Sequence, residues 1–175
     1  RRAAERPGGK KGTGVVEALL RAHPEAASVG TKNGWLPLHF AAQFQGGKKG
    51  TGVVEALLRA HPEAAWVREE DGWLPLHVAA QHQCGEKGTA VVAALLRTHP
   101  EAASVGEEDG WLPLHLAAQH QGGEKGTGVV EALLRAHPEA ASVGAERAWL
   151  PLHVAPGHQG GEEGPRVGEA RRRAQ

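Results

Sequence analysis

The chain has 175 residues, and its twenty lysines and arginines balance its twenty aspartates and glutamates. This is the length of one ordinary domain, and the balance leaves no net positive field of the kind that favours nucleic acid or an anionic membrane as a partner. No stretch approaches the roughly 20 apolar residues of a membrane span, and the first residues lack the apolar core of a secretory signal.

A five-residue phrase, Trp-Leu-Pro-Leu-His, recurs every 38 residues and divides the chain into units. A second phrase lies between the copies; it begins with Val-Val and continues to Leu-Leu-Arg and His-Pro-Glu-Ala-Ala. A period of this length is typical of stacked repeats. One such unit is too small to fold alone and needs neighbours to bury its two faces.

The order along the chain predicts three regions. Residues 1–12 are an N-terminal flank with part of a loop, and residues 13–155 form the repeat array. The array is predicted to hold a half unit, then three full units that start at Gly34, Gly72 and Gly110, then a degraded last unit. We expect the Arg-rich tail, residues 156–175, to be disordered or only partly helical, because it has no clear apolar stripe.

Each full unit is predicted to begin with a short helix, such as residues 74–81. Pro75 holds a first-turn position where its missing N–H costs nothing, and apolar or small residues follow at helical spacing. The next residues, 83–88, contain two glycines and no apolar period. We therefore expect a loop there and at the equivalent residues 46–50 and 122–126.

A second helix is predicted to follow each loop. In the first full unit Thr51 can cap its start, the Val-Val and Leu-Leu pairs form an apolar stripe, and Glu55 and Arg59 can pair at i, i+4. Pro62 ends the helix, because the residue before proline is pushed out of helical geometry. The polar connection after it ends in Asn-Gly or Asp-Gly, dipeptides suited to a tight turn with positive φ.

These elements, in this order, resemble the ankyrin repeat, whose pattern is Asp-Gly-x-Thr-Pro-Leu-His-x-Ala-Ala, a turn, then Val-Val-x-Leu-Leu-Leu. The resemblance covers about residues 13–155. It implies an all-α, helix–loop–helix repeat solenoid that serves as a non-catalytic protein–protein interaction module or scaffold. The implied partner is another protein, and no cofactor is implied.

Two departures from the family pattern are expected to affect stability. Leucine replaces the threonine before proline, which removes a helix cap and a hydroxyl partner for the histidine, at about 1 kcal/mol per unit. These leucines are Leu36, Leu74, Leu112 and Leu150. The turn between the helices is lengthened by about four residues into a glycine-rich loop, at only about 0.6 kcal/mol per doubling of length.

Eleven histidines raise the hypothesis of a metal site, but stacking places equivalent side chains one unit apart and not around one ion. Four occupy the Pro-Leu-His position, where the resemblance implies a structural hydrogen bond near the helix start: His39, His77, His115 and His153. Four others precede the helix-ending proline and can interact with terminal carbonyls: His23, His61, His99 and His137. We expect no metal.

The Gly-Lys segments support an alternative function, a weak anion or nucleotide binder. Residues 46–51 place glycines, Lys48 and Lys49 at a helix start, where backbone N–H groups suit a phosphate. The nucleotide-binding pattern, however, needs Gly-Lys-Ser/Thr after a strand, and the order here is Lys-Gly-Thr without one. A further hypothesis is recent duplication of the units without a dedicated ligand.

Cys84 replaces a loop glycine in one unit only and has no predicted base beside it, so we expect no enzyme. A lone cysteine cannot form an internal disulfide, which favours a reducing compartment, and we expect an intracellular, cytoplasmic protein.

Methionine is absent even at position 1, so we expect a monomeric segment of a longer chain. The cluster Arg171-Arg172-Arg173 is predicted to be part of a solvated tail.

The resemblance places the partner-binding surface on the turns and on the residues after Ala-Ala. On the turns it predicts a row of tryptophans beside acidic groups: Trp35, Trp73, Trp111 and Trp149, with Glu70 and Glu108. On the helix side it predicts Gln81, His82, Gln119 and His120. Tryptophan buries much area at low entropy cost, so the row fits a binding hot spot. The alternative is that each indole packs on the neighbouring turn and closes the stack.

Overall fold

The computed structural model describes residues 11–44, 48–82, 85–120, 127–145 and 148–155, and over these residues the chain has helices and no strand. An outer row of helices consists of α1 (Lys11–Ala22), α3 (Lys48–Ala60), α5 (Gly85–Thr98) and α7 (Thr127–Ala136). An inner row consists of α2 (Pro37–Phe44), α4 (Pro75–His82), α6 (Pro113–His120) and α8 (Pro151–Val154).

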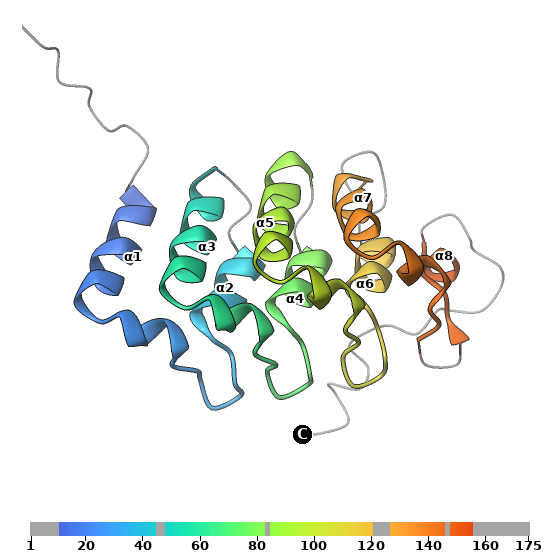
Figure 1. Cartoon of the computed structure of the whole chain (residues 1–175), viewed down its shortest axis with the longest axis horizontal. Helices are drawn as coiled ribbons and strands as arrows, with labels where there is room; N and C mark the ends of the chain where they lie inside the picture. The colour runs from blue at the N-terminus through green and yellow to red at the C-terminus, as the bar shows by residue number, and fades with distance from the viewer. Residues whose placement is uncertain (1–10, 45–47, 83–84, 121–126, 146–147, 156–175) are drawn as a thin grey trace, which may run out of the picture.

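Figure 1 shows the two rows side by side, with the turns between units projecting from the same side of the stack. Each outer helix contacts the next outer helix, and each inner helix contacts the next inner helix. The two helices of one unit also pack on each other. This arrangement confirms the predicted all-α repeat solenoid.

Two of the outer helices, α3 and α5, begin earlier than the sequence predicts. Helix α3 starts at Lys48, so Thr51 lies inside it and is not its cap, and α5 starts at Gly85. The segments predicted as loops therefore supply the first turn of these helices. Glycine costs only about 1 kcal/mol in a helix, and each added residue gains a backbone hydrogen bond once the helix has nucleated.

The threonines equivalent to Thr51 in neighbouring units pack between adjacent outer helices. A Cβ atom added to Gly128 would lie 2.6 Å from the hydroxyl oxygen of Thr89, and one added to Gly52 would lie 3.3 Å from the hydroxyl oxygen of Thr13. Because glycine has no side chain, α7 and α3 can approach the helices before them this closely.

Each outer helix ends before a short 3-10 helix, as the His-Pro dipeptide predicts. These are η1 (Pro24–Ser28), η2 (Pro62–Trp66), η3 (Pro100–Ser104) and η4 (Pro138–Ser142). The backbone N–H of His61 donates to the carbonyl oxygen of Leu57 over 2.9 Å, so the histidine closes the helix through its backbone. The side chain of His99 instead packs against the indole of Trp66, with 5.6 Å between ring centroids.

The turns have the predicted left-handed glycines, with φ of 77° at Gly34, 78° at Gly72 and 76° at Gly110. In the last unit Ala148 adopts φ of 59° at the equivalent position. The Cβ atom of alanine makes this conformation unfavourable, so the degraded last unit carries local backbone strain. The tail that follows, residues 156–175, lies outside the described residues.

Three of the four leucines that replace the family's threonine are buried in the core, and Leu150 is half-buried. Leu36, Leu74 and Leu112 are 4%, 1% and 4% exposed. Burying a leucine contributes about 1.5–3 kcal/mol, which exceeds the predicted loss of about 1 kcal/mol for a missing cap. The substitution therefore exchanges a polar cap for apolar packing.

Candidate functional site

The turns that lead into the second and third full units are each built around a carboxylate, which is buried in Glu69 and half-buried in Glu107. The side chain of Glu69 accepts hydrogen bonds of 3.0 Å from the backbone N–H groups of Asp71 and Trp73. Glu107 accepts the equivalent two bonds in the next unit, at 3.1 and 2.9 Å. Glu69 is only 6% exposed, and this burial raises its pKa. These bonds fix the turn and leave the next residue, Glu70, exposed.

The tryptophans are less exposed than the predicted row of accessible indoles. The indole N–H of Trp35 donates a 3.0 Å hydrogen bond to Glu69, which lies on the turn that leads into the next unit. Trp111 is 3% exposed, which corrects the prediction of an accessible indole there. Trp73 and Trp149 are half-buried. The packing alternative thus describes Trp35 and Trp111 better than the hot-spot hypothesis.

Buried histidines join each unit to the next. The Nδ1 atom of His77 accepts the backbone N–H of Leu74 at 3.1 Å, so Nε2 carries the proton and donates to the carbonyl oxygen of Trp111, 3.2 Å away. His39 and His115 make the same two bonds in their units. The predicted structural role is confirmed, because each ring accepts the backbone N–H of the leucine before proline and also bonds to the next turn.

Burial sets the charge of these histidines. Removal from water lowers the pKa of His77 to about 4 and also lowers the pKa of His39 and of His115. The rings are therefore neutral near neutral pH, as their hydrogen-bond pattern requires.

Exposed carboxylates lie on the turns of the second and third units. We call Glu70, Glu108 and Asp109 the turn-tip cluster, and all three side chains are exposed. The backbone N–H of Glu70 donates 3.1 Å to the carbonyl oxygen of Asn33, which connects one turn to the turn before it. The cluster is thus carried on turns that are fixed both within and between units.

The predicted residues after Ala-Ala come together at the ends of the inner helices. We call Gln81, His82, Gln119 and His120 the helix-end cluster. The amide N–H of Gln81 donates to Nε2 of His120, in the neighbouring unit, over 3.3 Å. Burial, and then the charge of His82, lower the pKa of His120. The two histidines are exposed and the two glutamines are half-buried.

The turn-tip and helix-end clusters are two separate surfaces. The turn-tip cluster precedes the start of the inner helices and the helix-end cluster closes them, and an eight-residue helix such as α4 is about 12 Å long. Between the clusters, residues 75–80 of α4 are all buried. The sequence predicted residues on both surfaces but did not show that the surfaces are apart, and their role in binding stays a prediction.

A family model described as ankyrin repeats, in three copies, matches residues 3–100 and 48–146 of the chain. The chain belongs to the ankyrin repeat family. No curated protein matches it. Ankyrin repeats are generally non-catalytic protein–protein interaction modules, and this is the general role of the family to which the array belongs.

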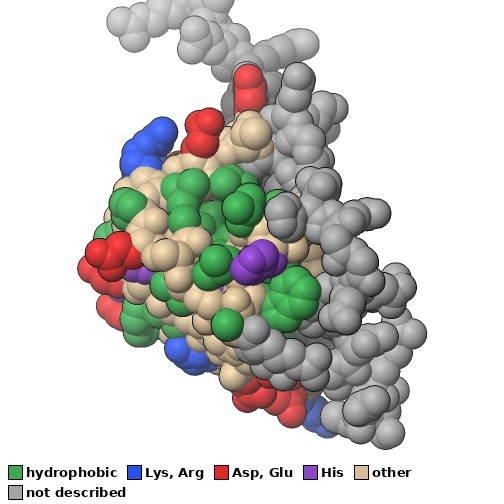
Figure 2. Space-filling view, turned by 90° about the vertical axis from the view of Figure 1, so that its right-hand side faces the viewer, with side chains coloured by type: hydrophobic (Ala, Val, Ile, Leu, Met, Phe, Trp, Pro, Cys, Tyr) green, Lys and Arg blue, Asp and Glu red, His purple; other side chains and the backbone are tan. Residues whose placement is uncertain are grey.

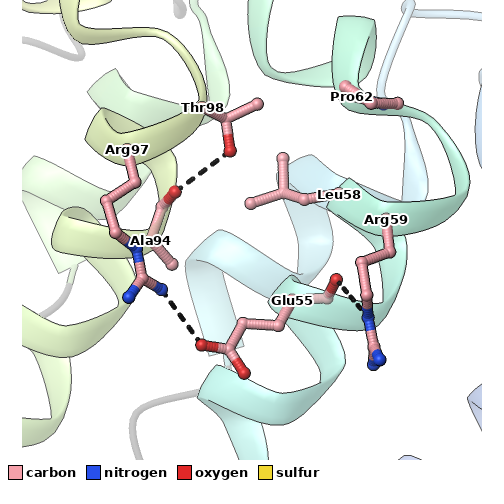
Figure 3. Close-up of a pocket in the computed structure, with 7 residues that line it drawn as sticks. All are labelled: Glu55, Leu58, Arg59, Pro62, Ala94, Arg97 and Thr98. Carbon is pink, nitrogen blue, oxygen red and sulfur yellow. Dashed lines mark hydrogen bonds and ion pairs between the residues drawn. The ribbon is translucent and has the colours of Figure 1, made fainter.

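Ion pairs connect the outer helices of neighbouring ankyrin units. The predicted i, i+4 pair within α3 is replaced by pairs between units: Arg97 lies 3.1 Å from Glu55, and Arg59 lies 3.5 Å from Glu17. Figure 3 shows Glu55 and Arg97 facing each other across a shallow groove of about 550 Å³ between α3 and α5. The signal was present in the sequence as a Glu and an Arg four residues apart in α1 and α3, and as the arginine alone in α5, where Ala93 stands at the glutamate position.

Several predictions concern parts of the ankyrin array that the structure leaves undescribed. Cys84 and the arginine cluster of the tail lie outside the described residues, as do the side chains of Lys48 and Lys49. Anion binding by these lysines stays a prediction. Among the described side chains, no group of three or more His, Cys, Asp or Glu could hold a metal ion. None of the described helices is long and apolar enough to cross a bilayer.

Proposed function

We propose that this ankyrin array is a non-catalytic interaction module that binds a basic segment of another protein at the turn-tip cluster. The observation that carries the proposal is the exposure of Glu70, Glu108 and Asp109 on two consecutive turns. Buried Glu69 and half-buried Glu107 hold the backbone of these turns through hydrogen bonds, so the exposed carboxylates are held on ordered backbone.

Preorganised charge favours a binding surface of this kind. Because the turns are already ordered, a partner loses little conformational entropy from the array when it binds. Carboxylates of one sign attract lysine and arginine side chains, speed association and disfavour acidic partners. Trp73 follows Glu70 in the sequence and precedes the inner helix α4. Its half-buried indole adds apolar area at the base of the turn.

The helix-end cluster is a second proposed contact area. Its glutamines and histidines offer hydrogen-bond donors and acceptors. Trp35 and Trp149, which are half-buried, remain proposed contacts of lower weight. The expected intracellular, cytoplasmic location also stays a prediction, based on the single cysteine.

Selection from a random peptide library displayed on phage tests the proposal without a known partner. We expect the selected peptides to be rich in Lys and Arg and to lose affinity at high salt. The double variant Glu70→Lys/Glu108→Lys should no longer bind them. The matched control is Glu63→Lys/Glu101→Lys, which makes the same charge change at exposed residues of η2 and η3.

The control variant is expected to bind the selected peptides as the unchanged protein does. Circular dichroism establishes that both double variants are folded. Peptides without basic residues, or binding that survives the reversal at Glu70 and Glu108, would overturn the assignment to the turn-tip cluster.

A further inference from the structure

The second 3-10 helix, η2, ends in a residue that differs from its equivalents. The helices η1, η3 and η4 end in serine, whose hydroxyl donates to the carbonyl oxygen of the glutamate three residues earlier, over 2.7, 2.7 and 2.8 Å. Helix η2 ends in Trp66, which cannot make this bond and is 43% exposed. Trp66 therefore replaces a hydrogen bond within the helix by an aromatic surface that faces solvent.

The exposure of Trp66 is not an effect of the edge of the array. Helix η2 packs on α3 of its own unit and on α4 and α5 of the next unit, in the middle of the stack (Figure 1). Figure 2 looks onto the last unit and shows hydrophobic side chains on the described surface there as well. That face lies at the edge of the described residues, whereas Trp66 lies well within them. Its exposure is therefore a property of the folded array.

Trp66 packs against His99 without giving this histidine a hydrogen-bond partner. The two ring centroids are 5.6 Å apart, and Nε2 of His99 is buried with no partner among the described residues. The equivalent rings of His61 and His137, whose preceding units carry serine, have no such buried and unpaired nitrogen. A buried polar atom without a partner lowers stability. Tryptophan at this position is thus explained better by binding than by folding.

Trp66 and His99 line a pocket together with two glutamates. The pocket has a volume of about 220 Å³ and is lined by Glu63, Trp66, His99 and Glu101, which come from η2 and from the start of η3. Pockets for small molecules have about 300–1,000 Å³, so this pocket has room for one side chain. Both glutamates are exposed, and neither forms an ion pair with a described residue. The pocket therefore combines an aromatic surface with two carboxylates.

A guanidinium group matches this combination. It is planar and weakly hydrated, stacks on an indole by cation–π attraction, and carries N–H groups at its edge that pair with carboxylates. The ammonium group of lysine is a compact, strongly hydrated charge and gains less from the indole. The two glutamates repel phosphates and acidic side chains. Among charged side chains, the pocket thus favours arginine.

We propose that the pocket formed by Glu63, Trp66, His99 and Glu101 binds an arginine side chain of a partner protein. The guanidinium stacks on Trp66, and its N–H groups pair with Glu63 and Glu101. One arginine held in so small a pocket has a dissociation constant on the order of 1 mM. It adds affinity when the rest of the partner is bound elsewhere on the array, because linkage raises its effective concentration.

The inference is separate from the proposed function and rests on different residues. A pocket with millimolar affinity does not by itself retain a peptide in a library selection. The variant Glu63→Lys/Glu101→Lys therefore remains a control for peptides that are selected at the turn tips. The arginine pocket needs a direct titration instead.

Nuclear magnetic resonance of the isotope-labelled full chain provides this titration. The indole N–H signal of Trp66 is assigned by its absence in Trp66→Ser and is followed as N-acetyl-arginine methylamide is added. We expect a saturable shift with a dissociation constant on the order of 1 mM. N-acetyl-lysine methylamide carries the same charge and should bind about fivefold more weakly, because its ammonium group is more strongly hydrated.

Charge removal tests the two glutamates. Glu63→Gln/Glu101→Gln should weaken the binding of the arginine compound about tenfold, because both carboxylates lose their charge. The matched control is Glu25→Gln/Glu139→Gln, which makes the same change at the equivalent exposed residues of η1 and η4. It should bind the arginine compound at Trp66 as the unchanged protein does.

Replacement of the indole tests the aromatic surface. Trp66→Ser should fold, because serine occupies this position in η1, η3 and η4, and circular dichroism checks this. The backbone N–H signal of His99 should shift saturably in the unchanged protein and should lose that shift in Trp66→Ser. Glu70→Lys/Glu108→Lys should leave the titration at Trp66 unchanged, so failure at one surface is distinguishable from failure at the other.

Three results would overturn the arginine pocket. The first is a shift of the Trp66 signal that grows linearly and never saturates. The second is equal affinity for the arginine and lysine compounds. The third is a saturable shift at His99 that persists in Trp66→Ser, because the indole would then have no part in binding.

Discussion

The indole N–H of Trp35 lies 3.0 Å from a carboxylate oxygen of Glu69, which lies on the turn that leads into the next repeat unit. The other oxygen of the same carboxylate accepts two backbone N–H groups of its own turn. One side chain therefore stabilises both a turn and the interface between two units.

Replacement of Glu69 by alanine should lower the free energy of unfolding by about 2–3 kcal/mol, because three hydrogen-bond donors lose a charged acceptor. Urea denaturation followed by far-UV circular dichroism measures this difference. Glu70→Ala is the matched control, since Glu70 is exposed, and its effect should stay within about 0.5 kcal/mol. Equal midpoints for the two variants would contradict the role assigned to Glu69.

Acid should destabilise the array through its buried histidines. The pKa of His77 is about 4 in the folded chain and about 6.5 when the chain is unfolded, so between these values the unfolded state binds the additional proton. Stability is therefore lost as the pH falls from about 6.5 toward 4. For His77 alone the loss between pH 7 and pH 5 is about 2 kcal/mol.

Urea denaturation at several pH values checks this sign. His77→Gln should be less stable at neutral pH but should lose less stability on acidification. Leu76→Ala serves as a control, because it removes a buried side chain, 1% exposed, without removing a titratable group. It should keep the full pH slope, and an unchanged slope in His77→Gln would show that the acid sensitivity has another origin.

Ala148→Gly should stabilise the last unit, because glycine adopts the observed φ of 59° without the steric cost that alanine incurs. A gain of about 1 kcal/mol is expected, seen as a higher thermal midpoint. Ala136→Gly, in the helical geometry of α7, should instead lower stability by about 1 kcal/mol. A loss of stability in both variants would rule out strain at Ala148.

The outer ion pairs should contribute little to stability. The side chains of Arg97 and Glu55 are 69% and 47% exposed, so Glu55→Gln should cost less than about 1 kcal/mol. That cost should vanish near 1 M salt, where screening acts over about 3 Å. Leu58→Ala, on the same helix and 7% exposed in the unchanged protein, should cost about 2–5 kcal/mol at any salt concentration. A large, salt-independent cost for Glu55→Gln would contradict this.

Much of the candidate site could be located from the sequence but not interpreted from it. The repeat placed the turns and the ends of the inner helices correctly, and both hold exposed polar side chains. The repeat pattern could not show that Glu69 is buried while Glu70 is exposed. These two adjacent glutamates differ only in the direction in which the folded turn points their side chains. It also could not show that Trp111 is buried at 3% exposure while equivalent indoles are half-buried.

The sequence by itself determined the features that depend on neighbours along the chain. Proline starts each inner helix, His-Pro ends each outer helix, and glycine at Gly34, Gly72 and Gly110 takes positive φ, because each of these follows from local sterics. The 38-residue period fixed the stack, since a single unit cannot bury its own faces.

Only the tertiary structure decided which partner each side chain takes across units. Arg59 forms its ion pair with Glu17 and not with the carboxylate of Glu55, and Thr89, the equivalent of the predicted cap Thr51, packs against Gly128. These choices depend on the distance and rotation between neighbouring units. That geometry results from the packing of two whole surfaces, and no local pattern encodes it.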